Sequence, residues 1–400
     1  MPSRVKVKNR IVEMNGDEMA RVMWDMIREK LITPFVEVEL RSFDLGINRR
    51  NETDDRVTAE AAEAIKEDFV GVKCATITPT AEQVKELGLK RRFKSPNATI
   101  RGALDGAIFR RPIIIPSIPP GIRSWENEIT IARHGSGDIY EAVEFAVPGP
   151  GALKLVYTPL GGAPIETPIA NLNGPGVAMA MCNLDASIRA FANVCISQAI
   201  ASRVDLWFAA KHTISRVYHE RFKTIFAEEV KRRSNELEAA GIEYIYRLID
   251  DAVAQLVKHP GGMLVALMNY DGDVWSDLLA AGFGSLGLMT SVLVSPGGQF
   301  EYEAAHGTVS RHYERHLAGE ATSTNSVASI FAWTGALRKR GELDGTSEVI
   351  KFAERLERAV VDTIEAGTMT ADLSLLRGRT KESAATTEGF IDAVSRRLAG

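Results

Sequence analysis

The fold is decided by five consecutive stretches near the start of the chain: RIVEM (10–14), DEMARVMWDMIREKL (17–31), VEVELRSFDLG (36–46), TAEAAEAIKEDF (58–69) and VGVKCATITP (70–79). Short apolar runs of strand length alternate here with segments whose apolar residues recur at helical spacing. A β-α-β-α-β order of this kind is typical of a largely parallel sheet whose strands are joined by helices. The sequence therefore predicts an α/β protein.

Three later regions differ from this opening. Strand-like runs alternate with Gly/Pro turns in residues 142–176, which predicts an antiparallel insertion that begins near Gly137. From Leu184 to about Asp277 the pattern is helical, and residues 215–241 are typical of one long amphipathic helix. The last region returns to α/β character, with a strand expected at 288–296 and a helix at 347–367 that ends at Gly367.

The composition is that of an ordinary soluble protein. The 400 residues are 45% hydrophobic and 25% charged, with a formal net charge of −4, so no general affinity for nucleic acid or for an anionic membrane is expected. No apolar run approaches the roughly 18 residues needed to span a bilayer. Cys74, Cys182 and Cys195 lack a paired spacing, and the first residues lack the pattern of a leader peptide. We therefore expect a reduced, cytoplasmic protein.

The segment GFGSLG (282–287) matches the G-x-G-x-x-G dinucleotide fingerprint. A Rossmann turn follows a strand and opens a helix, whereas this segment follows a helical pattern and leads into an expected strand. We interpret it as a glycine-rich turn before a central strand.

The segment NYDGDVWSD (269–277) places Asp273 and Asp277 four residues apart, on one face of a helix expected to begin after the Asp271-Gly272 turn. Two like charges repel there unless a cation lies between them, and hard oxygen ligands suit Mg²⁺ or Mn²⁺. The spacing does not fit a calcium loop. A role in capping the helix or stabilising its dipole is the alternative for these aspartates.

Arginines gather in KSPNATIRGALDGAIFRRP (94–112) and ARHGSGDIY (132–140), which hold Arg101, Arg110, Arg111 and Arg133. Planar guanidinium groups bind carboxylates through two hydrogen bonds, so several of them could fix a di- or tricarboxylate. Ordinary surface ion pairs are the alternative.

In AAHGTVSRHY (304–313), backbone amides and basic side chains could hold a phosphate, while the spacing of the histidines disfavours zinc even with Glu303 nearby.

Several motifs together resemble the NADP-dependent isocitrate dehydrogenases of the homodimeric, eukaryotic-like type. They follow in this order: GVKCATITP (71–79), KSPNATIR (94–101), RLIDD (247–251), NYDGDV (269–274), GSLGLMTSVL (284–293), EAAHGTVSRHY (303–313), TSTNSVASIFAWT (322–334) and IEAGTMTADL (364–373). The resemblance is collinear from about Val12 to about Asp372. It implies oxidative decarboxylation of isocitrate to 2-oxoglutarate, a reaction of the tricarboxylic acid cycle.

The resemblance also implies the isocitrate/isopropylmalate dehydrogenase-like fold, with a large and a small α/β domain and a clasp. The large domain would comprise residues 1–104 and 284–400, the small domain 105–137 and 185–283, and the clasp, which joins two subunits, 138–184. The partners would be a small tricarboxylate substrate and a second copy of the chain that shares each active site.

Site residues carried over by the resemblance fall into four groups. The catalytic residues would be Tyr140 and, from the partner subunit, Lys211. Substrate carboxylates would be bound by Thr78, Ser95, Asn97, Arg101, Arg110 and Arg133. The metal, Mg²⁺ or Mn²⁺, would be held by Asp273, Asp277 and Asp250 of the other subunit. NADP would be bound by Lys73, Thr76, Thr78, Gln255, Lys258, His306, Gly307, Thr308, Val309, Arg311, His312, Asn325 and Asp372.

Some positions depart from the family pattern: Gln83, Ala98, Arg111, Ala132, Gly135, Ser136, His212, Met268 and Trp275. They leave two alternatives open. The first is the same reaction on an isocitrate analogue, for example a malate with a phosphonomethyl arm, for which Arg111 could supply an extra positive charge, although it could also pair with a neighbouring acid. The second is a catalytically silent relative that acts as a binding subunit.

Overall fold

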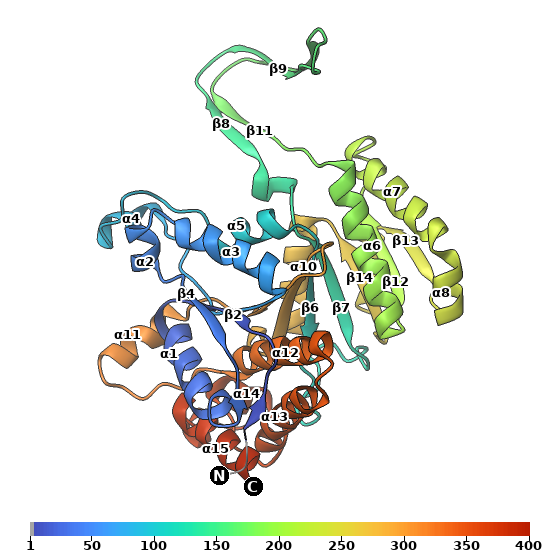
Figure 1. Cartoon of the computed structure of the whole chain (residues 1–400). Helices are drawn as coiled ribbons and strands as arrows, with labels where there is room; N and C mark the ends of the chain where they lie inside the picture. The colour runs from blue at the N-terminus through green and yellow to red at the C-terminus, as the bar shows by residue number, and fades with distance from the viewer. Residues whose placement is uncertain (1–3) are drawn as a thin grey trace.

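The computed structural model describes residues 4–400, and a ten-stranded sheet crosses the body of the molecule (Figure 1). Its strands lie in the order β13 (Tyr244–Leu248), β12 (Asp205–Ala210), β14 (Met263–Leu267), β7 (Ile129–His134), β6 (Ala107–Pro112), β15 (Met289–Val294), β16 (Phe300–Ala304), β5 (Val70–Lys73), β2 (Ile11–Asn15) and β4 (Leu40–Asp44). Neighbouring strands are parallel except around β6 and β15, where β7–β6, β6–β15 and β15–β16 are antiparallel.

The opening stretches form the predicted units. Strand β2 leads through α1 (Glu18–Ile27) to β4, and α3 (Arg56–Asp68) leads on to β5. Strand β2 lies between β4 and β5 and is parallel to both. The predicted α/β class and its parallel sheet at this end of the chain are confirmed.

Helices cover both faces of the sheet. On the front face, which carries Lys73, Glu303 and Arg110, lie α3, α5 (Pro96–Leu104), α9 (Ile249–Leu256) and α10 (Asn269–Phe283). On the back face, which carries Tyr302 and Phe109, lie α1, α6 (Asp185–Ser202), α7 (Tyr218–Arg232), α12 (Val327–Asp344) and α13 (Ser347–Glu365). Each sheet face therefore buries its own apolar cores, as expected of a three-layer α/β/α protein.

The remaining elements are short or lie at the periphery. Strands β1 (Val5–Lys6) and β3 (Val36–Glu37) form a separate parallel pair. The other helices are α2 (Ile47–Glu52), α4 (Ala81–Glu86), α8 (Ser234–Ala240), α11 (Ser310–Leu317), α14 (Ala371–Leu376), α15 (Thr387–Ala399), the π-helix Arg28–Ile32 and the 3-10 turns Asp138–Glu141, Leu286–Leu288 and Lys381–Ser383. Across residues 4–400, no helix combines the length and the apolar character that crossing a membrane requires.

An arm of antiparallel strands projects from this body (Figure 1). Strand β8 (Val143–Val147) pairs with β11 (Gly176–Ala180), and β9 (Gly151–Tyr157) pairs with β10 (Ile165–Leu172). The predicted antiparallel insertion is thereby confirmed. Large apolar side chains of this arm, among them Phe145, Tyr157 and Val177, are more than half exposed.

The helical interpretation of residues 184–277 was only partly right, because β12, β13 and β14 lie within it. Strand β14 is buried at every position and so lacks the alternation that reveals a half-buried strand. The single long helix expected at 215–241 is two helices, α7 and α8. They are separated at Arg233, whose side chain binds the Asn193 carbonyl and the Ser197 hydroxyl of α6.

Helix α10 also differs from its prediction, because it begins at Asn269 and not after Gly272. The Asp138 carboxylate accepts a hydrogen bond from the Tyr270 amide at 3.0 Å, which satisfies a free N–H of the first turn. A Cβ on Gly272 would lie 2.7 Å from the Cβ of Arg133, so glycine at this position lets α10 approach β7 closely. The glycine-rich segment 282–287 is the predicted turn, since α10 ends at Phe283 and β15 begins at Met289.

Candidate active site

Polar side chains form a row across four neighbouring strands on the front face. The register pairs Lys73 of β5 with Glu303 of β16, Glu303 with Ser291 of β15, and Ser291 with Arg110 of β6. All four residues are buried. Because side chains alternate between the two faces of a strand, the register alone brings these groups to the same side.

Glu303 is the centre of the first cluster. Its carboxylate accepts hydrogen bonds from the Asn97 amide at 3.0 Å and the Arg101 guanidinium at 2.9 Å, and the Lys73 ammonium lies 3.6 Å away. Helix α5 presents Asn97 and Arg101 one turn apart, on the side that faces β16.

Neighbouring charges set the ionisation of this cluster. Burial by itself would raise the pKa of Glu303, but the positive charges of Lys73, Arg101 and Arg110 outweigh it and lower that pKa. The opposite holds for Glu301, two residues earlier on the same strand, because burial and the nearby Glu303 charge raise its pKa to about 8. Glu303 is therefore ionised at neutral pH, whereas Glu301 binds a proton readily.

Asp273 of α10 is the centre of the second cluster. Its carboxylate accepts a hydrogen bond from the Tyr140 hydroxyl at 2.5 Å and contacts the Arg133 guanidinium, while an Arg110 nitrogen lies 3.9 Å away. Arg133 also donates to the Asn269 side-chain oxygen at 2.7 Å and lies over the Tyr140 ring. Burial and the hydrogen bond to Asp273 raise the pKa of Tyr140 to about 12, so its hydroxyl keeps its proton at neutral pH.

Arg101, Arg110 and Arg133 are close enough together to disturb one another. Burial and then the charge of Arg101 lower the pKa of Arg110, and the same two causes lower that of Arg133 to about 10. Among residues 4–400, the Arg110 Nε, the Asn97 Oδ1 and the Ser291 Oγ are buried and have no hydrogen-bond partner. Mutually repelling guanidinium groups beside unpaired polar atoms are suited to a ligand with several carboxylates.

Asp273 and Asp277 fit a divalent cation through the chemistry of their donor atoms. They supply carboxylate oxygens from successive turns of α10, and both approach Arg110, with an Asp277 oxygen 3.4 Å from it. Oxygen donors of this kind suit Mg²⁺ or Mn²⁺. Within residues 4–400 no three His, Cys, Asp or Glu side chains gather closely enough to hold a metal.

Lys211 and Asp250 form a separate, exposed pair. The Lys211 ammonium donates to the Asp250 carboxylate at 2.5 Å, and 65% of the Asp250 side chain is exposed. Gln255 lies on the same helix α9, and Lys258 follows its end. In the part of the chain that the structure describes, no hydrogen bond or ion pair joins these four residues to Asp273 or Asp277. The predicted site residues therefore divide into two groups.

The segment after β16 forms an open loop before α11. Thr308 and Ser310 both donate hydrogen bonds to the Glu18 carboxylate, and Val309 between them has the left-handed φ of 59°. An open pocket of about 600 Å³ is lined by Val309, Ser310, Arg311, His312 and Arg315. Two of its basic residues, Arg311 and His312, were predicted to bind the cofactor.

Other residues predicted to bind the cofactor lie in neighbouring loops. His312 is hydrogen-bonded to the Thr324 hydroxyl at 2.7 Å, and Asn325 donates to the Asp372 carboxylate at 2.9 Å. Thr76 and Thr78 lie in the loop after β5, while Lys73 is buried against Glu303 and the Cys74 carbonyl. The loop geometry brings several predicted groups together, and their contacts with a cofactor stay predictions.

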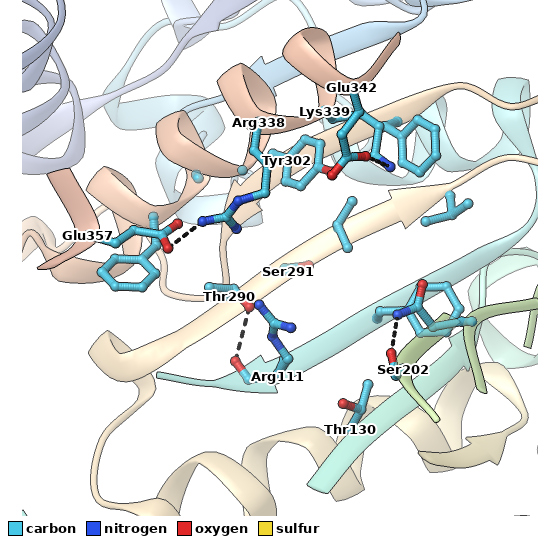
Figure 2. Close-up of a pocket in the computed structure, with 18 residues that line it drawn as sticks. Arg111, Thr130, Ser202, Thr290, Ser291, Tyr302, Arg338, Lys339, Glu342 and Glu357 are labelled. Atoms are coloured by element: carbon cyan, nitrogen blue, oxygen red, sulfur yellow. Dashed lines mark hydrogen bonds and ion pairs between the residues drawn. The ribbon is translucent and has the colours of Figure 1, made fainter. Parts of the chain in front are cut away.

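Arg111 does not face the substrate arginines, which corrects the idea that it adds charge to their pocket. It follows Arg110 on β6, so its side chain lies on the back face (Figure 2). There its Nε is 3.7 Å from Glu128, the neighbouring acid that was the alternative partner. The main observation in favour of a more highly charged substrate is thereby removed.

Sequence reasoning missed or undervalued several groups of the site. Glu303 entered only as a possible metal helper, yet it anchors Asn97 and Arg101. Asn269, which positions Arg133, and Ser291 were not singled out. The alternation in FEYEA (300–304), with Glu301 and Glu303 on one face, was the signal that could have identified the row.

Four of the nine departures from the family pattern have structural roles. Gln83 forms the capping box of α4 with Thr80, Trp275 and Met268 are buried in apolar cores, and His212 is hydrogen-bonded to the Tyr246 hydroxyl at 2.6 Å.

Comparison with known proteins gives a consistent result. The family model described as isocitrate/isopropylmalate dehydrogenase matches residues 6–394. The chain is 52% identical to the peroxisomal isocitrate dehydrogenase [NADP] of Candida tropicalis, over 99% of this chain and 97% of that protein. It is 51% identical to the mitochondrial enzyme of that name from Saccharomyces cerevisiae (99% and 94% covered) and 49% identical to the isocitrate dehydrogenase [NADP] of Sphingobium yanoikuyae (98% and 97%).

Proposed function

The chain belongs to the isocitrate/isopropylmalate dehydrogenase family, and we propose that it oxidises isocitrate with NADP and decarboxylates it to 2-oxoglutarate. The observation that carries this proposal is the front-face cluster, in which Arg110 and Arg133 approach the paired aspartates Asp273 and Asp277, with Arg101 beside both arginines. A tricarboxylate with a hydroxyl group needs this combination of cationic and metal-ligating groups.

In this proposal the arginines bind and orient the substrate carboxylates. Arg110 and Arg133 leave their ion pairs with Asp273 in part and turn to the substrate, while Arg101 is held by Glu303. Ser95, Asn97 and Thr78 add hydrogen bonds from α5 and from the loop after β5. Freed from the arginines, the Asp273 carboxylate becomes available as a ligand.

Mg²⁺ or Mn²⁺ would be held by Asp273 and Asp277 together with Asp250 from a second copy of the chain. When bound, such an ion supplies a Lewis acid for the substrate hydroxyl and its neighbouring carboxylate. Lys211 of that second copy would take the hydroxyl proton as hydride passes to NADP. Tyr140, which holds its proton at neutral pH, would then deliver that proton to the carbon from which CO₂ departs.

NADP would lie along the loop between β16 and α11 and in the loop after β5. Arg311 would offer positive charge and His312 a ring nitrogen to the extra phosphate of NADP, and Gln255 and Lys258 of the second copy would complete its site. His306, Gly307, Thr308 and Val309 would contact the cofactor through the loop, with Asn325 and Asp372 beside them. Lys73 and Thr76 would approach from the sheet side.

A homodimer with shared sites is part of the proposal. Lys211 and Asp250 lie in an exposed pair apart from Asp273, which is the arrangement needed if each copy completes the site of the other. The arm β8–β11 exposes large apolar side chains, as interface strands do before they are covered. We propose the predicted division into a large domain (1–104, of which 1–3 lie outside the described residues, and 284–400), a small domain (105–137 and 185–283) and a clasp (138–184).

A cytoplasmic location is also proposed. Cys74, Cys182 and Cys195 are unpaired, in keeping with a reducing compartment. The relatives named above include peroxisomal and mitochondrial proteins, so the compartment needs a direct test by fractionation.

The activity is tested with purified full-length protein, isocitrate, NADP and Mn²⁺, by following NADPH and CO₂ together. We expect a kcat/KM above about 10⁴ M⁻¹s⁻¹ for isocitrate with NADP, and a much lower value with NAD. A phosphonomethyl malate that reacts faster than isocitrate would overturn the substrate assignment. If neither compound yields NADPH and CO₂, the result would favour the catalytically silent alternative.

The shared site is tested by mixing two inactive variants, Asp273→Asn and Lys211→Met, under conditions that exchange subunits. If each site takes Asp273 from one copy and Lys211 from the other, a mixed dimer contains one intact site, and random mixing restores about a quarter of the wild-type activity. If each copy builds its own site, no mixed dimer contains an intact site and no activity returns. Mixing either variant with itself is the control.

A further inference from the structure

The back face of the sheet carries a pocket that is separate from the candidate active site. It encloses about 240 Å³ between β6, β15 and β16, the end of α6 and helices α12 and α13 (Figure 2). Its floor is made by Phe109, Val292 and Tyr302, whose register places them side by side on three neighbouring strands. The front-face row is offset from these residues by one position on each strand, so the two sites lie back to back.

One charged group in this pocket lacks a hydrogen bond. Arg111 forms no side-chain hydrogen bond within residues 4–400, and its only ion-pair partner there, Glu128, is 3.7 Å away. The other charged residues are paired inside the pocket, since Arg338 donates to Glu357 at 2.5 Å and Lys339 to Glu342. The pocket therefore offers guanidinium donors from Arg111 that are free to bind a ligand.

Arg338 is a second guanidinium group in the pocket. Arg111 and Arg338 line the pocket together with Tyr302. In Figure 2 the Arg338 guanidinium lies below Tyr302 in the view, and the Arg111 guanidinium lies below that of Arg338. Because Arg338 uses one nitrogen for Glu357, its remaining donors can join those of Arg111.

The walls set the rest of the ligand's chemistry. Phe109, Val292, Val294 and Phe331 supply apolar surface, while Gln198 and Ser202 of α6 line another part of the pocket. A free inorganic anion would bind to Arg111 but would leave the apolar surface of the pocket uncovered. A carboxylate that carries a small ring or branched apolar group matches both halves of the pocket.

We propose that the back pocket is a binding site for small aromatic or branched carboxylates, with Arg111 as the residue that holds the carboxylate. This site is distinct from the one that handles isocitrate, and it does not depend on the proposed function. Arg111, which departs from the family pattern, thereby gains a role that the front-face chemistry does not give it.

Benzoate is the probe, titrated into the full-length protein by calorimetry and by saturation-transfer NMR, without substrate, metal or cofactor. We expect benzoate to bind, and benzamide, which keeps the ring but lacks the charge, to bind at least about tenfold more weakly because a charge-assisted pair is lost. Acetate, which lacks the ring, should also bind more weakly than benzoate.

Two variants place the binding in this pocket. Arg111→Gln should weaken benzoate binding at least about tenfold, as the loss of a bidentate ion pair implies. Ser202→Trp, at an exposed position of the lining, should weaken it similarly by filling the entrance while Arg111 stays in place. Arg397→Gln, at an exposed arginine of α15, is the matched control and should leave the affinity unchanged.

The outcomes are separable from those of the activity assay. Benzoate that binds equally well to wild type, Arg111→Gln and Ser202→Trp would be bound elsewhere, for example by the front-face arginines, and the proposal would be wrong. Absence of binding to the wild type up to tens of millimolar would also overturn it. Unchanged melting temperatures of the variants show that a lost affinity is not a lost fold.

Discussion

The two groups of predicted catalytic residues differ sharply in how the chain holds them. Asp273 is in contact with Arg133, Tyr140 and Arg110, and Arg133 is itself fixed by Asn269. Lys211 and Asp250 have one ion pair with each other, and 65% of the Asp250 side chain is exposed. The first group is organised within one chain and contributes to its stability. The second contributes little to the fold, and the proposed function gives it a role at the site of a second copy of the chain.

The substitution Asp273→Asn is the strongest test of the difference between these two groups. The substitution removes a metal-ligating charge and leaves the buried Arg133 without its anionic partner. We expect kcat/KM for isocitrate to fall at least about 10³-fold and the melting temperature to fall as well, because an unpaired buried charge is costly. Steady-state kinetics and thermal denaturation measure the two effects. Asp362→Asn, at an exposed position of α13, should change neither.

Lys211→Met should separate function from stability. If Lys211 is the base, activity falls by about 10²–10⁴-fold, the usual contribution of a positioned acid or base. The free energy of unfolding should change by less than about 0.5 kcal/mol, because the only partner lost is the exposed Asp250. Urea denaturation beside kinetics checks this, with Lys231→Met on α7 as the control. A loss of stability as large as that of Asp273→Asn would contradict the distinction between the two groups.

Glu303→Gln tests the front-face cluster that is centred on the Glu303 carboxylate. Its carboxylate holds Arg101 and Asn97 and lies 3.6 Å from Lys73, so the neutral amide leaves buried cations without a counter-charge. We expect a loss of about 3 kcal/mol in the free energy of unfolding and a higher KM for isocitrate, since Arg101 loses its support. Glu348→Gln, at an exposed position of α13, is the control. A variant with unchanged stability would show that solvent or another group replaces Glu303.

Elements that depend on a local pattern could be predicted from the sequence, whereas neighbours that depend on the register of the strands could not. The β-α-β order of residues 10–79 and the turn at 282–287 follow from spacing, and the strand-rich arm follows from its turns. Strand β14 was missed because its burial on both faces removes any alternation. The pairing of Lys73, Glu303, Ser291 and Arg110 brings together residues more than 200 positions apart, and only the sheet order determines it. The same register sends Arg111 to the opposite face from Arg110.

A pH-dependent effect is expected at Glu301, the protonated neighbour of the buried cluster. Its pKa of about 8 in the fold exceeds the ordinary 4.5, so the folded state binds a proton that the unfolded chain releases between those values. Stability linked to this group is therefore present below pH 4.5 and is lost as the pH rises toward about 8.

Glu301→Gln cannot ionise and avoids that loss. Its free energy of unfolding relative to wild type should rise by at least about 1 kcal/mol between pH 5 and pH 9, since each pKa unit corresponds to about 1.4 kcal/mol. Urea denaturation at both pH values measures the difference. The Lys211 ammonium lowers the pKa of Asp250, which is therefore ionised throughout pH 5–9, so Lys211→Met should show no comparable pH dependence in this range. A difference between Glu301→Gln and wild type that stays constant with pH would mean that the pKa of Glu301 is not raised in the fold.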